Sequence, residues 1–86
     1  MTILEQIIER YADEEILKAD GFDEAIIGFD DKSSRLIYSR TKCVNILMER
    51  DGMTEIDAME FFDFNVWGAD MGEKTPIWCD DDFITE

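Results

Sequence analysis

Apolar residues near the start of the chain recur every three or four positions, which is the spacing of one face of an α-helix. The residues of this face are Ile3, Leu4, Ile7, Ile8, Tyr11, Ala12 and Ile16. Thr2 and Glu5 have the spacing of a capping box, which predicts that the helix begins directly after Thr2. Gly21 can adopt a positive φ and end it, so the helix is expected to run to about Leu17 or Lys18.

The pattern then changes to two short runs of β-branched and aromatic residues, 24–30 (EAIIGFD) and 35–39 (RLIYS). Because the polar residues 31–34 separate them, they predict a β-hairpin. Alternation along the strands predicts that Ala25, Ile27 and Phe29 share one face, with Leu36 and Tyr38 beside them if the register permits. Ile26 and Ile37 are expected on the other face. Gly28, inside the first strand, suggests a bulge or a close approach of two backbones.

Helical spacing returns after residue 40, where the apolar residues are Cys43, Val44, Leu47 and Met48. Ser39 or Thr41 is the expected cap of this second helix, and the sequence RDG ends it. Thr54 is placed to cap a third helix that runs to about Val66 or Trp67. After it, residues 75–79 have the character of a short strand, with Pro76 indicating a sheet edge or a strand start.

These elements predict an α+β protein in the order α-β-β-α-α-β, with a small antiparallel sheet of about three strands and helices packed on one side. A chain of 86 residues supports one small hydrophobic core. We therefore expect residues 1–86 to form a single acidic domain, with an acidic tail that frays from about residue 80.

Charge narrows the range of partners. The chain has 22 acidic and eight basic residues, a formal net charge of −14, and five of the basic residues lie within residues 32–50. Such a chain repels nucleic-acid phosphates and anionic membrane surfaces, so neither direct nucleic-acid binding nor membrane binding is expected. No segment approaches the ~18 apolar residues of a membrane span, and the start of the chain does not resemble a signal peptide. We expect a cytoplasmic protein.

The residues that most enzymes rely on are scarce in this chain. It contains no histidine, which excludes Ser-His-Asp, Cys-His and histidine-containing zinc sites within one chain. Cys43 and Cys79 lack CxxC spacing and fit reduced thiols, although a disulfide between them stays open. The glycines of GADMG follow a helix, whereas a phosphate-binding loop precedes one. We therefore expect a protein that is not an enzyme and that needs no cofactor or metal.

The third helix is the most unusual segment, because large apolar residues surround its axis and do not keep to one face. Phe61, Phe64 and Trp67 belong to this set, and Trp78 follows in the predicted strand. Either the helix is central to the core, or part of it is left for another chain. These four residues are our candidates for partner contact, with Trp67 the first choice, because tryptophan is enriched in interface hot spots.

Two rows of carboxylates offer a second kind of contact. Glu5, Glu9 and Asp13 follow one another at four-residue steps in the first predicted helix, and Asp57, Glu60 and Asp63 follow at three-residue steps in the third. Carboxylates four residues apart on a helix are about 6 Å apart, close to the spacing of phosphates along a strand. The rows are therefore either ordinary exposed helix faces or a mimic of nucleic acid that binds a basic protein.

The segment ILMERDGMTEIDAMEFFDFNVWGADMGEKTPIW carries a resemblance to a known group. Over about residues 36–78 the chain resembles small acidic, uncharacterised proteins encoded mostly by bacteriophages and occasionally by bacteria. No activity or site residue comes with the resemblance. It implies a phage-encoded protein that binds and modulates or inhibits a host protein in the host cytoplasm, with a basic nucleic-acid-binding protein as one candidate partner. The alternative is a self-associating structural protein whose aromatic helix forms a homodimer interface.

Overall fold

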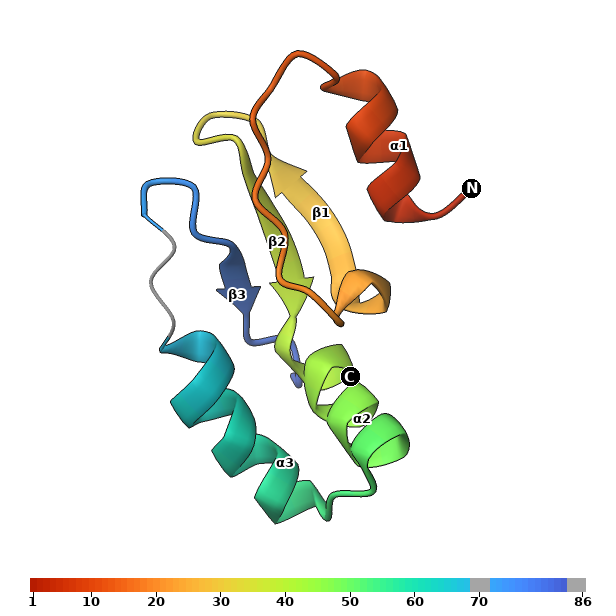
Figure 1. The fold of residues 1–86 in the computed structure, drawn as a ribbon, viewed down its shortest axis with the longest axis vertical. Coiled ribbons are helices and arrows are strands. Elements are labelled where there is room, and N and C mark those ends of the chain that lie inside the picture. The colour runs from red at the N-terminus through yellow and green to blue at the C-terminus, as the bar shows by residue number, and fades with distance from the viewer. Residues whose placement is uncertain (69–71, 84–86) are drawn as a thin grey trace.

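The computed structural model describes residues 1–68 and 72–83, and it confirms the α+β class and the predicted order of elements (Figure 1). The elements are α1 (Ile3–Arg10), β1 (Ile26–Asp30), β2 (Arg35–Ser39), α2 (Arg40–Asp51), α3 (Glu55–Phe61) and β3 (Ile77–Cys79). A 3-10 turn, η1 (Asp23–Ala25), precedes β1, and a π-helical segment, η2 (Phe62–Trp67), continues α3. Figure 1 shows α1 beside β1, with α2 and α3 gathered at the opposite end of the molecule.

The three strands form one sheet in the order β1-β2-β3. β1 and β2 are antiparallel as predicted, but β3 runs parallel to β2, so the expectation of a purely antiparallel sheet was wrong. The connection between β2 and β3 explains the parallel direction. α2 leads the chain away from the sheet and α3 leads it back (Figure 1), and Thr75 then lies beside the start of β2, where its carbonyl accepts from Arg35 at 3.4 Å. A strand that begins there can only run alongside β2 in the same direction.

The predicted bulge at Gly28 is confirmed, and it changes which face each residue of β1 occupies. Ile26 pairs with Tyr38, whereas Gly28 pairs with Ile37, so the register shifts between Ile26 and Gly28. The prediction that Ile26 lies on the face opposite Tyr38 was wrong, because one extra residue reverses the alternation. Ile26 is 2% exposed and belongs to the core, as Tyr38 does.

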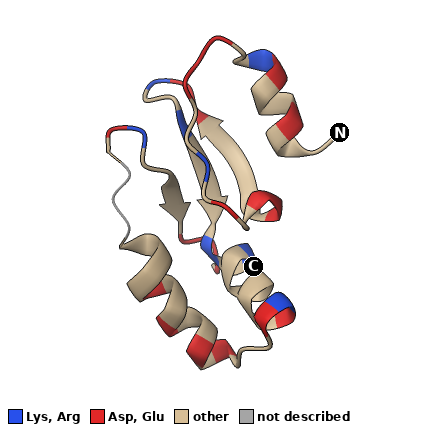
Figure 2. Ribbon diagram, in the orientation of Figure 1, with Lys and Arg blue, Asp and Glu red and all other residues tan. Residues whose placement is uncertain are grey.

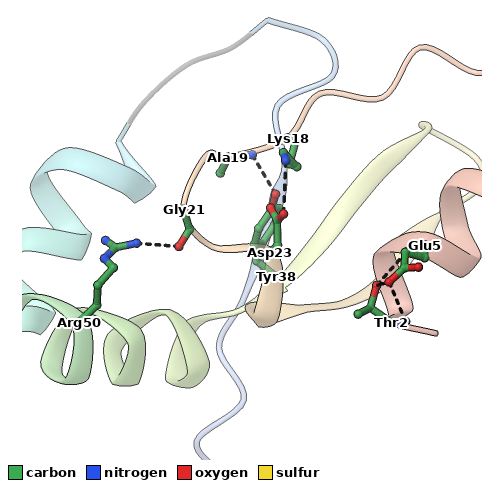
Figure 3. A network of polar contacts seen from close by, with 8 residues as sticks. All are labelled: Thr2, Glu5, Lys18, Ala19, Gly21, Asp23, Tyr38 and Arg50. Carbon is green, nitrogen blue, oxygen red and sulfur yellow. Dashed lines mark hydrogen bonds and ion pairs between the residues drawn. The ribbon is translucent and has the colours of Figure 1, made fainter.

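The first helix is shorter than the sequence predicted, since α1 ends at Arg10 and not near Leu17. Tyr11 leaves the helix and stacks on Phe29 with 4.4 Å between ring centroids. The chain then crosses the sheet, and the Ala19 amide donates a 2.8 Å hydrogen bond to the buried Tyr38 hydroxyl (Figure 3). A helix that continued past Arg10 would not place the Ala19 amide at this hydroxyl, so tertiary contacts override the helical pattern.

A second contact joins the segment between α1 and β1 to the end of α2. The Arg50 Nη1 atom donates to the Gly21 carbonyl at 2.8 Å (Figure 3), and the guanidinium lies 5.5 Å from the centroid of the Phe22 ring. Gly21 has a φ of +89°, and a Cβ there would lie 2.8 Å from Arg50. Gly21 is therefore needed for its backbone conformation and for this close approach.

The helices α2 and α3 begin and end as their caps predicted. The Ser39 hydroxyl accepts from the Lys42 amide at 3.1 Å, and Gly52, with a φ of +69°, ends α2. The Thr54 hydroxyl accepts from the Asp57 amide at 3.2 Å and caps α3. The helical path reaches Trp67 as expected, but its last six residues are wound as a π-helix.

The predicted acidic tail makes a contact with α2 that the sequence did not suggest. The Asp81 carboxylate accepts from the Ser39 hydroxyl at 2.6 Å and from the Thr41 amide at 3.3 Å. Burial disfavours its charged form, but hydrogen bonds from Ser39 and Thr41 outweigh burial and lower the pKa of Asp81. Residues 84–86 of the tail lie outside the described residues, so its fraying stays a prediction.

Replacement of Asp81 by Asn is expected to weaken the start of α2. A carboxylate near a helix N-terminus typically stabilises a protein by about 0.5–1 kcal/mol, and Asn keeps the acceptor but removes the charge. Because the folded protein lowers this pKa below its ordinary value of 3.8, the stabilisation is present above about pH 4 and is lost as the pH falls through the folded value. Urea unfolding between pH 2.5 and 6 measures the difference, with Asp82→Asn as control. Equal slopes with pH for the wild type and Asp81→Asn would contradict the expectation.

Candidate functional site

The aromatic residues of α3 and η2 divide between the core and the surface. Phe62 and Val66 are buried, whereas Phe64 is 83% exposed, Trp67 is 61% exposed and Phe61 is 38% exposed. The buried residues follow Ala58 at four-residue steps and so form one face, while the exposed aromatic side chains project in other directions. The sequence left open whether this helix is core or interface, and the structure shows that one face is packed into the core and that Phe64 and Trp67 are exposed.

Trp78, the fourth aromatic candidate, lies mostly within the core. Its ring lies 4.9 Å from the Tyr38 ring and 5.5 Å, edge to face, from the Phe62 ring. It is only partly buried, and its indole nitrogen is enclosed without a hydrogen-bond acceptor among the described residues. Trp78 therefore ties β3 to η2, and its remaining surface is available to the pocket described next.

Three of the four aromatic candidates meet at one pocket, which we call the aromatic pocket. It has a volume of about 380 Å³. It is lined by Arg40, Asp63, Phe64, Trp67, Trp78 and Asp80. The segments β3, η2 and the start of α2 therefore all contribute to it, although they lie far apart in the sequence. Phe61 does not line it.

An ion pair forms one wall of the aromatic pocket. The Arg40 Nη2 atom lies 3.0 Å from Asp63 Oδ1, and the Arg40 guanidinium is 5.6 Å from the centroid of the Phe62 ring. About half of the Asp63 side chain is exposed, so this pair contributes at most about 1 kcal/mol to stability. Its effect on the pocket is to hold a cation over a buried ring and to leave part of the Asp63 carboxylate facing solvent.

The remaining acidic candidates lie on two separate surfaces. Asp57 and Glu60 are exposed on α3, as predicted. Glu5 belongs to a capping box, in which its Oε1 accepts from the Thr2 amide at 3.3 Å. Glu9 is exposed on α1, but Asp13 lies beyond the end of that helix, so the predicted row of three does not form along one helix.

Figure 2 places the acidic residues of α1 and those of α3 at opposite ends of the molecule. The two rows therefore do not join into one surface. The prediction of nucleic-acid mimicry is left with α3 alone, whose row is interrupted by the pairing of Asp63 with Arg40.

The described groups with shifted pKa values do not line the aromatic pocket, although the Tyr38 ring contacts Trp78 and Asp81 follows Asp80. Burial raises the pKa of Tyr38 and that of Cys43 to about 12 each. Hydrogen bonds from Ser33 and from the Lys32 amide lower the pKa of Asp30. Each of these shifts has a structural cause. Among residues 1–68 and 72–83, no cluster of three or more Cys, Asp or Glu side chains is placed to hold a metal ion.

Sequence reasoning missed two residues of the aromatic pocket, Arg40 and Asp80. Arg40 had one available signal, since it is one of the five basic residues within 32–50, and these attract the acidic residues elsewhere in the chain. Asp80 had none, because its place follows from the parallel pairing of β3, which was not predicted.

Comparisons with protein-family models, with curated proteins and with solved structures give no match to this chain. The resemblance to phage proteins therefore stays a prediction, as does the cytoplasmic location. Within the described part of the chain, no helix has the length and apolar character needed to cross a membrane.

Proposed function

We propose that this protein is a non-enzymatic binding module whose partner is another protein, and that contact is made through the exposed side of η2. The observation that carries the proposal is the exposure of Phe64 and Trp67, adjacent in space at the aromatic pocket. Large aromatic side chains that remain in water beside a pocket are typical of interface anchors. The resemblance to phage proteins suggests that the partner is a host protein whose action is modulated or inhibited.

The charge of this surface favours a partner of a different kind over a second copy of the chain. Residues 55–67 contain four acidic residues, Glu55, Asp57, Glu60 and Asp63, and no basic one. A homodimer through this helix would bring two such sets together, and like charges across an interface oppose association. A basic surface on the partner would instead be attracted to it. The homodimer alternative is therefore an outcome that the test must distinguish.

The test captures proteins from a bacterial lysate with the tagged protein and with a Phe64→Ser/Trp67→Ser variant. If the proposal holds, the wild type retains a defined partner and the variant loses it, since removing hot-spot residues typically weakens binding by 2 kcal/mol or more, roughly thirtyfold. Ile8→Ser is the matched control, because Ile8 is 52% exposed on α1, away from the aromatic pocket. This variant is expected to capture the same partner.

Sedimentation of the pure protein completes the experiment. A monomer that captures its partner through Phe64 and Trp67 supports the proposal. A dimer that the double substitution dissociates replaces it with the homodimer alternative. Capture that the double substitution and Ile8→Ser leave equally intact would place the contact elsewhere and overturn the proposal.

A further inference from the structure

We propose that the aromatic pocket receives a cationic side chain, lysine or arginine, from the protein partner. This inference rests on the proposed protein-binding function and specifies the chemistry that the partner must bring. It follows from which side chains surround the pocket, from their charges, and from two cation–π contacts that the protein already makes within itself.

Aromatic rings form much of the lining of the aromatic pocket, with Phe64, Trp67 and Trp78 all contributing. The face of an aromatic ring is electronegative and attracts a cation placed over it, most strongly for tryptophan. The volume of about 380 Å³ lies within the range of ~300–1,000 Å³ that is typical of small-ligand pockets. The aromatic pocket therefore has the lining and the size to hold the end of a long cationic side chain.

The charged groups of the lining also favour a cation. Two carboxylates, Asp63 and Asp80, line the pocket together with one cation, Arg40. Arg40 is held by Asp63 at 3.0 Å and by the Phe62 ring, so the lining keeps one acidic charge in excess. Among the described residues, no ion pair involves Asp80. An incoming ammonium or guanidinium group would lie between aromatic faces and this carboxylate.

The protein itself shows that its aromatic residues accept guanidinium groups. Arg40 lies 5.6 Å from the Phe62 centroid, and Arg50 lies 5.5 Å from the Phe22 centroid. In both cases a carboxylate completes the arrangement, Asp63 for Arg40 and Asp51 for Arg50. The aromatic pocket presents the same pair of elements, an aromatic ring and a carboxylate, and among residues 1–68 and 72–83 no arginine lies over Trp67.

The experiment uses two short peptides, acetyl-Gly-Arg-Gly-amide and the same peptide with citrulline in place of arginine. Citrulline keeps the shape of arginine but has no charge. Trp67 and Trp78 are the two tryptophans of the chain and both line the pocket, so their indole N–H resonances in NMR spectra report on it directly. Binding of the arginine peptide at low salt is expected to shift these resonances in a saturable way, with citrulline at least about fivefold weaker.

Two variants separate this site from the general attraction of an acidic protein for any cation. Asp80→Asn removes the unpaired carboxylate of the lining and is expected to weaken binding about two- to fivefold. Asp31→Asn removes the same charge from an exposed position in the turn between β1 and β2, outside the pocket, and is expected to leave binding unchanged. Trp67→Leu, which keeps apolar bulk but removes the aromatic face, is expected to weaken binding by a similar two- to fivefold.

Three results would overturn the inference: equal binding of the two peptides, equal weakening by Asp31→Asn and Asp80→Asn, or binding unaffected by Trp67→Leu. These failures are distinct from a failure of the proposed function. If capture from the lysate depends on Phe64 and Trp67 while the arginine peptide does not bind, the protein-binding function stands and the partner's anchor is apolar. If the peptide binds as expected but no protein is captured, the protein-binding function fails.

Discussion

Replacement of Phe62 by Ala is expected to destabilise the protein by about 3–5 kcal/mol, the usual cost of removing a fully buried phenylalanine. Phe62 is 0% exposed and lies at the junction of three elements. Its ring contacts Trp78 of β3 edge to face and lies under the guanidinium of Arg40 from α2. The substitution would therefore leave a cavity where α2, η2 and β3 meet.

Phe64→Ala is the matched control for this prediction. It removes the same side chain from the same helical segment, but at a position that is 83% exposed, where substitutions typically change stability by 0.5 kcal/mol or less. Urea unfolding followed by tryptophan fluorescence measures both variants. If Phe62→Ala were no more destabilising than Phe64→Ala, the packed and open faces of this helix would be wrongly assigned.

Tyr38→Phe is expected to cost about 1–2 kcal/mol, although it removes only one oxygen atom. The Tyr38 hydroxyl accepts the Ala19 amide hydrogen bond at 2.8 Å, and the variant leaves that partly buried amide without its acceptor. Tyr11→Phe serves as control, because Tyr11 packs through its ring against Phe29. We expect the control to stay within about 0.5 kcal/mol of the wild type in urea unfolding. Equal losses in the two variants would contradict the role of the Tyr38 hydroxyl.

Tyr38 also predicts how stability depends on alkaline pH. Burial raises its pKa from the ordinary 10.0 to about 12 in the folded protein, so the unfolded chain loses this proton first. The stabilisation is complete below pH 10 and is lost as the pH rises to about 12. Burial also raises the pKa of Cys43 from 9.0 to about 12, so this thiol adds to the loss of stability as the pH rises above 9. Unfolding measurements between pH 8 and 11.5 should therefore show a shallower decline for Tyr38→Phe than for the wild type; parallel curves would contradict the assignment.

The parts of the fold that local sequence specifies were predictable. Thr2, Ser39 and Thr54 cap their helices as expected, because capping depends on residues only three positions apart. The bulge at Gly28 was predicted for a similar reason, but its effect on the alternation of Ile26 and Ile27 was not. Sequence spacing shows where a strand is irregular, whereas the pairing partner decides which residue is looped out.

The end of α1 and the direction of β3 were not predictable, because contacts between distant residues determine both. α1 stops at Arg10 since residues beyond it are needed to reach Tyr38, which lies 19 positions after Ala19. β3 is parallel because two helices intervene between it and β2. The spacing of residues over a few positions carries no information about contacts between residues so far apart in the sequence.

The candidate site was predicted in part. The aromatic excess marked Phe64, Trp67 and Trp78 as candidates for partner contact, and the structure leaves Phe64 and Trp67 exposed but buries most of Trp78. The acidic rows were the weaker inference. The first row needed α1 to include Asp13, but α1 ends at Arg10. The two rows could form one surface only if α1 and α3 lay side by side, and they lie at opposite ends of the molecule (Figure 2).

The pairing of β3 with β2 has a consequence for the order in which the molecule assembles. Phe29 and Leu36 are paired across only seven positions of sequence, whereas Ile37 and Ile77 are paired across forty. Short loops close first, so the hairpin is expected to form early and β3 to dock late. Three residues at a sheet edge are also among the first to detach in brief local openings of a folded protein. Because Trp78 detaches with them, a ligand that binds the aromatic pocket only while β3 is docked is expected to make these openings rarer.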